Sequence, residues 1–344
     1  MSDLKTHLKA LSEALAVSGD EAEVRTLIRE WITPHVDSYT IDALGNLTAV
    51  KKGTGDSALK VMIAAHMDET GFMVTSCDAG LCDVKPIGGH DMRFAAAKRV
   101  AVSGAKTPGV ILHVPIHKTH GEGSPPDPDG ITVDLGSGSA KAGDRIAFVG
   151  DYAELGETVI RGKAFESRAG CAILLELLAG EPLPVDLIAA FTVQAHVYGR
   201  GAKVATQRYR PDAAIILRGS ACNDFPAEED ATPDDENAPR LRLGGGVILV
   251  GKESWIITSR PLGTHLRQTA LTNGIAVQAE AAHTTFSEIQ SVANSPTGTP
   301  TMAVAIPIRY PQSPNGLIDS RDMDAAVHLL RTALRTLTAE SLKE

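Results

Sequence analysis

The alternation of apolar strands with helices in the second half of the chain constrains the fold most. After Gly162 the segment "SRAGCAILLELLAG" has a helical pattern, and "VDLIAAFTVQ", "DAAIILR" and "TMAVAIPI" read as buried strands. A last helix is expected beyond Asp319 or Ser320, either of which could cap it, because apolar residues recur there at helical spacing. These are Met323, Val327, Leu330, Leu334 and Leu337. The alternation predicts an α/β sandwich.

The first 66 residues fit the same architecture. Leucines at positions 4, 8, 11 and 15 predict one amphipathic helix, and apolar residues between 24 and 32 predict a second. "SYTIDALGNLTAVKK" reads as a hairpin, and an apolar run then forms a strand that ends at His66.

The sequence pattern changes between Phe72 and about residue 160, where short β-like runs alternate with many Gly and Pro residues. We therefore expect a small all-β domain, 68–162, inserted into an α/β domain made of 1–67 and 163–344. Segment 117–130 is expected to be a mobile exposed loop, and the acidic, Pro-rich segment 223–240 a solvated connector or a cation-binding loop.

The composition limits the classes of molecule that the chain is expected to bind. The net charge is −9, from 33 basic and 42 acidic residues, and no basic stripe is visible, so neither nucleic acid nor a membrane surface is an expected partner. The N-terminal segment lacks an apolar signal core, which predicts a cytoplasmic protein. The four cysteines show no metal-ligand spacing and are expected to be reduced thiols.

Polar residues follow several predicted strands, at the sheet edge where α/β proteins bind ligands. They are His66 with Asp68 and Glu69, Glu166, His196, Arg218 and Gln312. His66 and Asp68 would point to the same face. That arrangement suits a metal-binding imidazole oriented by a carboxylate, or simply a half-buried imidazole satisfied by Asp68.

The chain resembles the tetrahedral aminopeptidases, a family of two-metal peptidases also labelled glutamyl or deblocking aminopeptidase or endoglucanase. The resemblance runs nearly end to end. It is carried by "IDALGNLTAVKKG", "AHMDETGFMV", "PIGGHD", "GKAFESRAG", "FTVQAHVYGRGA" and "IPIRYPQSPNGLIDSRD". It implies a peptidase α/β domain with an inserted β dimerisation domain, and a homo-oligomer between a dimer and a dodecamer.

The family's site residues match only in part. His66, a metal ligand in the family, and its supporting Asp68 are intact, and so is Arg168. Glu166 replaces the bridging Asp. Ala195 and His196 replace the two glutamates that serve as general base and metal ligand, while Arg218 replaces a ligand Asp and Gln312 a ligand His. A later Gly-Thr-Asp segment is also altered, to Ser287-Glu288.

Charge then argues against two bound ions, since Arg218 adds a permanent positive charge where a carboxylate ligand is expected. We predict a direct ion pair between Arg218 and Glu166 in the vacated metal position. No cofactor is expected, or at most one divalent ion (zinc or cobalt) held by His66, Glu166 and His196. Without a carboxylate at Ala195, the metal-bound water would also lack its base.

Three functions follow. The first is a pseudo-peptidase that keeps the fold and assembly and binds peptides. The second is an active hydrolase with a rebuilt site, using one metal at His66, Glu166 and His196, or a metal-free pair of His196 and Glu166. The third is a glycosidase with Glu69 and Glu166 as paired carboxylates. Cys171 and Cys222 are further candidate nucleophiles. The commoner alternative is that they are buried thiols without a catalytic role.

Overall fold

The computed structural model describes residues 3–55, 59–89, 92–113, 130–224, 240–281, 288–296 and 298–343. Nearly all of the predicted loop 117–130 and of the acidic segment 223–240 therefore lies outside the described residues.

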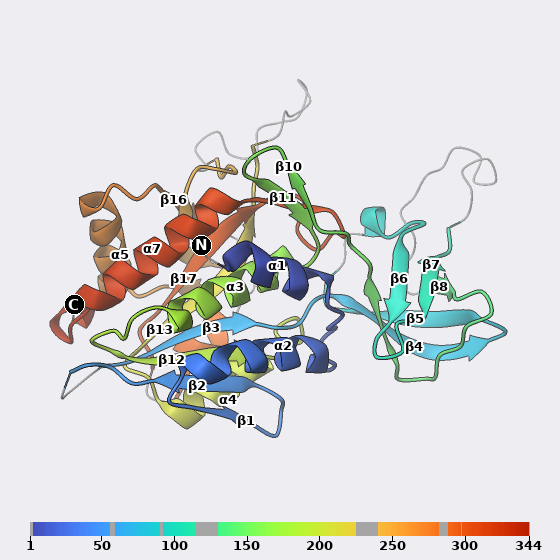
Figure 1. Ribbon diagram of the computed structural model, residues 1–344, viewed down its shortest axis with the longest axis horizontal. Helices are drawn as coiled ribbons and strands as arrows, with labels where there is room; N and C mark the ends of the chain where they lie inside the picture. The colour runs from blue at the N-terminus through green and yellow to red at the C-terminus, as the bar shows by residue number, and fades with distance from the viewer. Residues whose placement is uncertain are drawn as a thin grey trace.

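One nine-stranded sheet forms the centre of the larger part of the molecule (Figure 1). Strands β3, β12, β13 and β17 run parallel, whereas β2 and β14 join them in antiparallel fashion. The order across the sheet is β1 (Ser38–Ile41), β2 (Leu47–Lys51), β12 (Asp186–Thr192), β3 (Lys60–His66), β13 (Ala213–Ala221), β17 (Thr301–Ile308), β14 (Val247–Glu253) and β15 (Ile256–Ile257), with β16 (Val277–Ala281) also paired to β14.

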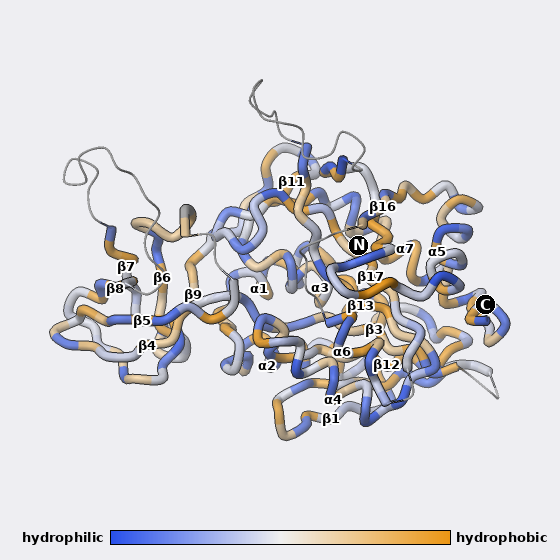
Figure 2. Tube along the Cα trace, turned by 180° about the vertical axis from the view of Figure 1, so that it is seen from behind, coloured by the Kyte–Doolittle hydropathy of each residue, from blue (hydrophilic) through white to orange (hydrophobic). Residues whose placement is uncertain are grey.

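Helices cover both faces of this sheet. On one face lie α1 (Leu4–Glu13), α2 (Ala22–Ile32), α3 (Phe165–Ala179), α5 (Arg260–Thr272) and α7 (Ser320–Thr336); on the other lie α4 (Arg200–Tyr209) and α6 (Ile289–Ala293). Strand side chains alternate between the two layers, so Ile215 and Leu217 pack under α3 while Ile216 packs on the α4 side. The tube in Figure 2 shows apolar residues concentrated in these central strands. The predicted α/β sandwich is confirmed.

Short 3-10 turns complete the described helical structure: η1 (Thr33–His35), η2 (Met92–Phe94) and η5 (Glu340–Leu342). Helix α7 begins as predicted, because the Asp319 side chain accepts a hydrogen bond from the Arg321 backbone N–H and caps the helix.

A closed barrel stands beside the sandwich, at the right in Figure 1. Its strands, in order around the barrel, are β4 (Gly71–Asp78), β5 (Leu81–Ile87), β8 (Ile131–Asp134), β7 (Pro108–Ile111), β6 (Arg99–Val102) and β9 (Arg145–Phe148). It has its own apolar core, in which Phe72 and Phe148 meet edge to face with ring centroids 5.5 Å apart. The predicted small β fold is present.

The two strands that follow the barrel in the chain lie in a separate sheet. β10 (Ala153–Leu155) and β11 (Val159–Gly162) form a three-stranded sheet with β18 (Gly316–Asp319), which precedes α7. This sheet connects the end of the inserted segment to the C-terminal part of the chain. The domain boundaries at 68 and 162 and the dimerisation role of the barrel remain predictions.

The prediction of four reduced cysteines is wrong for one pair. Cys77 on β4 and Cys82 on β5 are directly opposite in the hairpin register and form a disulfide, whereas Cys171 and Cys222 are buried free thiols. The hairpin turn sets this register, with Ala79 and Gly80 both at positive φ. Sequence spacing alone did not indicate that the two side chains face each other.

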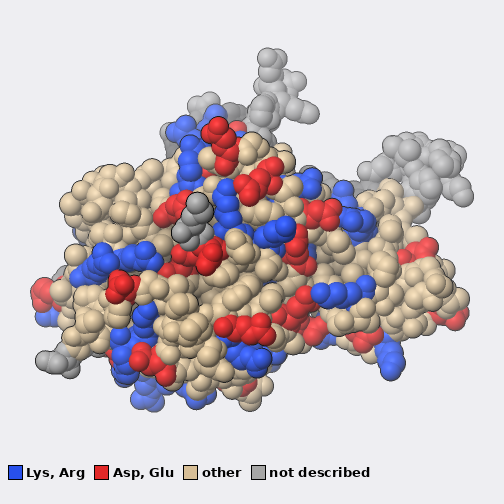
Figure 3. All heavy atoms as spheres, viewed as in Figure 1, with Lys and Arg blue, Asp and Glu red and all other residues tan. Residues whose placement is uncertain are grey.

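Among the described helices none is both long and apolar enough to cross a membrane. On the face shown in Figure 3, basic and acidic side chains are interspersed, and no patch of a single sign covers it.

Candidate functional site

The site begins at the end of β3. His66 is the last residue of that strand, and its Nδ1 lies 3.1 Å from the backbone oxygen of Asp68 and 3.4 Å from the Asp68 Oδ1. The expected contact between the imidazole and the carboxylate is thus formed. Burial opposes a charged His66, but Asp68, Glu288 and Glu166 outweigh it and raise the pKa of the imidazole.

Asp68 is fully buried and its two carboxylate oxygens are already engaged. Oδ2 accepts a hydrogen bond from the Ser18 hydroxyl at 2.5 Å and from the His196 backbone N–H at 3.1 Å, and Oδ1 accepts from the Ala195 backbone N–H at 3.0 Å. Burial disfavours its charge, yet the hydrogen bond and charge of His66 hold the pKa of Asp68 well below its usual range. Asp68 therefore orients its neighbours.

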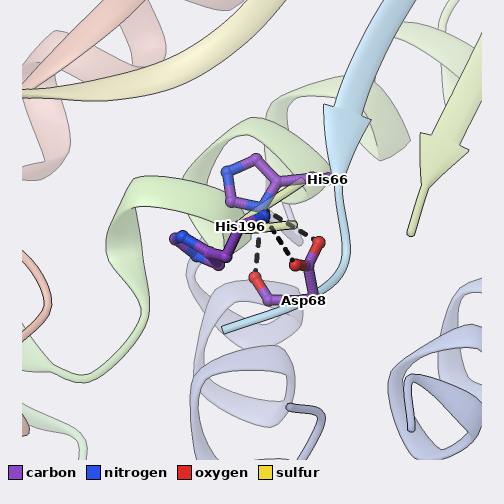
Figure 4. Close-up of side chains that lie close together, drawn as sticks. All are labelled: His66, Asp68 and His196. Carbon is purple, nitrogen blue, oxygen red and sulfur yellow. Dashed lines mark hydrogen bonds and ion pairs between the residues drawn. The ribbon is translucent and has the colours of Figure 1, made fainter. Parts of the chain in front are cut away.

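His196 turns toward His66. Strand β12 ends at Thr192, and Gln194 has a φ of 55°, so the chain bends before His196 and does not continue as a strand. The two imidazole rings meet edge to face with centroids 5.2 Å apart (Figure 4). The His196 Nε2 is buried without a hydrogen-bond partner among the described residues, and burial lowers the pKa of this ring.

His66, Asp68 and His196 are the described residues whose possible metal-ligand atoms all lie within 4.8 Å of one another. Asp68 already accepts three hydrogen bonds, and the two imidazoles provide the nitrogen donors of this cluster. His66 and His196, both expected as ligands of a single ion, are in this cluster, whereas Glu166, expected as the third ligand, is not.

Glu166 and Gln312 lie at the edge of the same region. Both line a narrow pocket of about 10 Å³ together with Glu69 and Lys163. Glu166, in the first turn of α3, is close enough to raise the pKa of His66 and to oppose the lowered pKa of His196. Ala164 and Gln312 have φ values of 56° and 58°, a left-handed conformation that non-glycine residues adopt mainly at constrained positions.

Glu69 is held by two buried cations. The Lys163 ammonium lies 2.6 Å from each carboxylate oxygen, the Arg168 guanidinium 3.3 Å from Oε1, and the Ala16 backbone N–H donates at 3.0 Å. A carboxylate so fully engaged is a poor general acid, so this geometry argues against the pairing of Glu69 with Glu166 as a glycosidase pair. Arg168 keeps two buried nitrogens, Nε and Nη1, without a hydrogen-bond partner in the described structure.

The predicted ion pair between Arg218 and Glu166 is wrong. Arg218 bonds through Nε to Glu253 at 2.7 Å and through Nη2 to Glu280 at 3.0 Å. Helix α3 packs on the Leu217 and Gly219 face of β13, where a Cβ on Gly219 would lie 2.9 Å from the Glu166 Cα.

Side chains alternate along a strand, so Arg218 points to the opposite face from Glu166. Glu253 and Glu280 lie on β14 and β16, on the far side of β17 from β13 and thus away from β3 and His66. The sequence did not reveal these two carboxylates as partners.

The structure adds Glu288 to the site. It immediately precedes α6 and is 2% exposed, and the Thr192 side chain and the Ala202 backbone are polar neighbours that favour its charge. Burial raises the pKa of Glu288 to about 7, against the opposing effect of His66. The altered segment Ser287-Glu288 was the only signal in the sequence, and Ser287 lies outside the described residues.

The buried thiols do not act as nucleophiles in this arrangement. Burial raises the pKa of both Cys171 and Cys222 to about 12, so both are protonated near neutrality. The Cys171 thiol donates to the His66 backbone oxygen at 3.2 Å, a structural contact beneath the site.

Charge balance shows what the site can hold. Lys163 and Arg168 contribute two positive charges, whereas Asp68, Glu69, Glu166 and Glu288 contribute four negative charges when ionised. Asp68, Glu69 and Glu288 are buried and Glu166 is half-buried, so this excess of negative charge is costly unless it is compensated. One divalent ion at the two imidazoles, or protons on His66 and Glu288, would balance it. Among the described residues, the two imidazoles and the Asp68 carboxylate form a possible site for a metal ion.

Comparison with known proteins agrees with this architecture. The M42 glutamyl aminopeptidase profile matches residues 45–329. The glutamyl aminopeptidase of Lactococcus lactis is 29% identical over 99% of this chain and 99% of its own.

Solved aminopeptidase structures also resemble this chain in fold. Aminopeptidase APDkam598 from Desulfurococcus kamchatkensis superposes with a TM-score of 0.91 at 29% identity, covering 99% of this chain and 97% of that one. The TET1 peptidase of Pyrococcus horikoshii, which can assemble into a tetrahedron or a large octahedral shell, has a TM-score of 0.84 at 25% identity, covering 97% of this chain and all of the other. The chain therefore belongs to the M42 glutamyl aminopeptidase family.

Proposed function

We propose that this chain is a homo-oligomeric M42 protein that does not carry out two-metal peptide hydrolysis and binds at most one divalent ion. One observation carries the proposal: the metal-ligand cluster of the described residues holds two imidazoles and a single carboxylate, Asp68, which already accepts three hydrogen bonds and contacts His66. A co-catalytic pair of ions needs more ligands than these.

The missing base supports the same proposal. Ala195 occupies the base position, and its contribution to the site is a backbone N–H donated to Asp68. A general base typically contributes about 10²–10⁴ in rate. The similarity to a TET1 peptidase that assembles into closed shells supports assembly as a retained property.

Metal analysis of the purified protein tests this proposal directly. After dialysis against zinc or cobalt, we expect no more than one equivalent of metal per chain, and hydrolysis of aminoacyl-anilides no faster than in a His66→Ala/His196→Ala control. Two tightly held equivalents per chain, or strong turnover that the double variant loses, would overturn it.

A second candidate, a one-metal hydrolase, is favoured by the negative charge excess and by the unpartnered His196 Nε2. In that case His66 and His196 would hold the ion, which would polarise a carbonyl or acidify a water, while Glu166 would stay available to accept a proton. Turnover that depends on one equivalent of metal, and falls about 10²-fold or more in Glu166→Gln, would select this candidate.

A further inference from the structure

A second cavity lies away from the His66 site, where the start of α1 meets the ends of α2 and α3. Figure 1 shows these three helix ends on the same side of the helical layer. The cavity measures about 430 Å³, which falls in the usual range of small-molecule sites, about 300–1,000 Å³. Along α3 its lining residues are roughly 14–20 Å from Glu166, at 1.5 Å per helical residue.

An aromatic surface forms one wall of this cavity. The Trp31 and His7 rings lie 4.5 Å apart, centroid to centroid, at an interplanar angle of 37°. Leu175 and Leu178 add apolar surface beside them. An indole face in such a setting attracts organic cations through its quadrupole.

The ionisable groups that line the cavity are three carboxylates and two imidazoles, His7 and His35. Asp3, Glu30 and Glu176 line it, no Lys or Arg does so in the described structure, and none of the three carboxylates forms an ion pair with a described residue. The nearby cations bond to backbone oxygens and not to these carboxylates: Lys51 donates to the backbone oxygens of Leu178 and Gly180, and Arg331 donates to that of Glu176.

His7 supplies an unpartnered polar atom. Its Nδ1 is buried and has no hydrogen-bond partner among the described residues. Burial lowers the pKa of His7, and His35 acts in the same direction against the opposing effect of Asp3 and Glu176, which favours the neutral ring, one of whose nitrogens can accept a hydrogen bond.

We propose that this cavity is a binding site for an organic cation, an aliphatic amine or guanidinium compound that stacks on Trp31 and donates a hydrogen bond to His7. A metal ion fits less well, because no three ligand atoms of described residues lie within 4.8 Å of one another in this region. Carboxylates spread around an aromatic wall suit a larger cation with an apolar stem. The site does not depend on the metal content of the His66 region.

Tryptophan fluorescence tests the proposal, because the chain has only two tryptophans and Trp255 is 80% exposed on the β14–β15 turn. In a Trp255→Phe background, agmatine should change the Trp31 emission with a saturable curve. Pentanoate and pentanol, which share the alkyl stem without the cation, should not.

Matched variants locate the site. Glu176→Gln and Glu30→Gln should each weaken agmatine binding about tenfold or more. His7→Phe, which keeps an aromatic ring against Trp31 but removes Nδ1, should also weaken it. Glu181→Gln, a change outside the cavity, should leave the dissociation constant unchanged. Unaltered melting curves confirm that each variant is folded.

The proposal is overturned if agmatine gives no saturable signal at millimolar concentration, if pentanol gives the same signal, or if the glutamate and His7 variants bind agmatine as tightly as the Glu181→Gln control.

Discussion

Burial in the folded protein disfavours the negative charge of Glu288. Its pKa rises from 4.5 to about 7 because it is buried, so the folded state holds a proton that the unfolded chain has released. The associated stability is fully present below pH 4.5 and is lost as the pH rises through about 7. In chelator-treated protein, Glu288→Gln should raise the free energy of unfolding by up to about 3 kcal/mol near pH 8 and hardly change it near pH 4. Urea titrations at both pH values measure this difference; an equal effect at both would contradict the assignment.

Asp68 differs from Glu288: it is also buried, but its neighbours stabilise its negative charge and lower its pKa. Asp68→Ala would leave the Ser18 hydroxyl and two backbone N–H groups without their acceptor. We expect a loss of about 3–5 kcal/mol in the free energy of unfolding. Asp151→Ala is the control, because the ion pair of Asp151 with Arg99 is exposed and should be worth less than about 1 kcal/mol. Equal losses for the two variants would show that Asp68 is not a structural centre.

At the scale of elements, Arg218 ties β13 to the outer strands of the sheet. Its guanidinium contacts Glu253 on β14 and Glu280 on β16, and it also bonds to the Ser220 hydroxyl. Removing the cation from this buried group should cost about 3–5 kcal/mol, so Arg218→Met should unfold at much lower urea concentration. Adding Glu253→Gln and Glu280→Gln should recover much of the loss. Arg218→Met with unchanged stability would exclude this network as the reason for the arginine.

The β4–β5 hairpin makes a chemical prediction. Because Cys77 and Cys82 are paired while Cys171 and Cys222 are free, denatured protein without reductant should incorporate two alkyl groups per chain, and reduced protein should incorporate four. Intact-mass spectrometry counts them, and peptide mapping assigns the pair. Four alkylated thiols before reduction would show that the hairpin is not cross-linked in solution.

At the scale of the whole molecule, the barrel and the relatives argue for assembly. The barrel has a small core of its own, and the similar TET1 peptidase of Pyrococcus horikoshii forms closed shells. We expect light scattering to give a mass of at least two chains of 36.2 kDa, because a domain of this size has little core to spare for independent stability. A monomer at micromolar concentration would contradict the proposed homo-oligomer.

The sequence by itself determined the architecture. Both the alternation of apolar strands with amphipathic helices and the short β-like runs of the middle segment are visible as periodic patterns of apolar residues. These patterns follow directly from the backbone geometry of helices and strands. It also brought His66 and Asp68 together, because they are two residues apart at one strand end.

Only the tertiary structure decided the partners of the charged residues. The sequence predicted that Arg218 would meet Glu166, but Glu253 and Glu280 lie closer in space although they are distant in the chain. It likewise gave no sign that Cys77 faces Cys82, that Glu288 is buried, or that Trp31 and His7 line a cavity. Such pairings depend on strand order, on the face each side chain takes and on where a turn ends a strand. Those are properties of the packed chain, because an electrostatic partner is set by distance in space and not by separation in sequence.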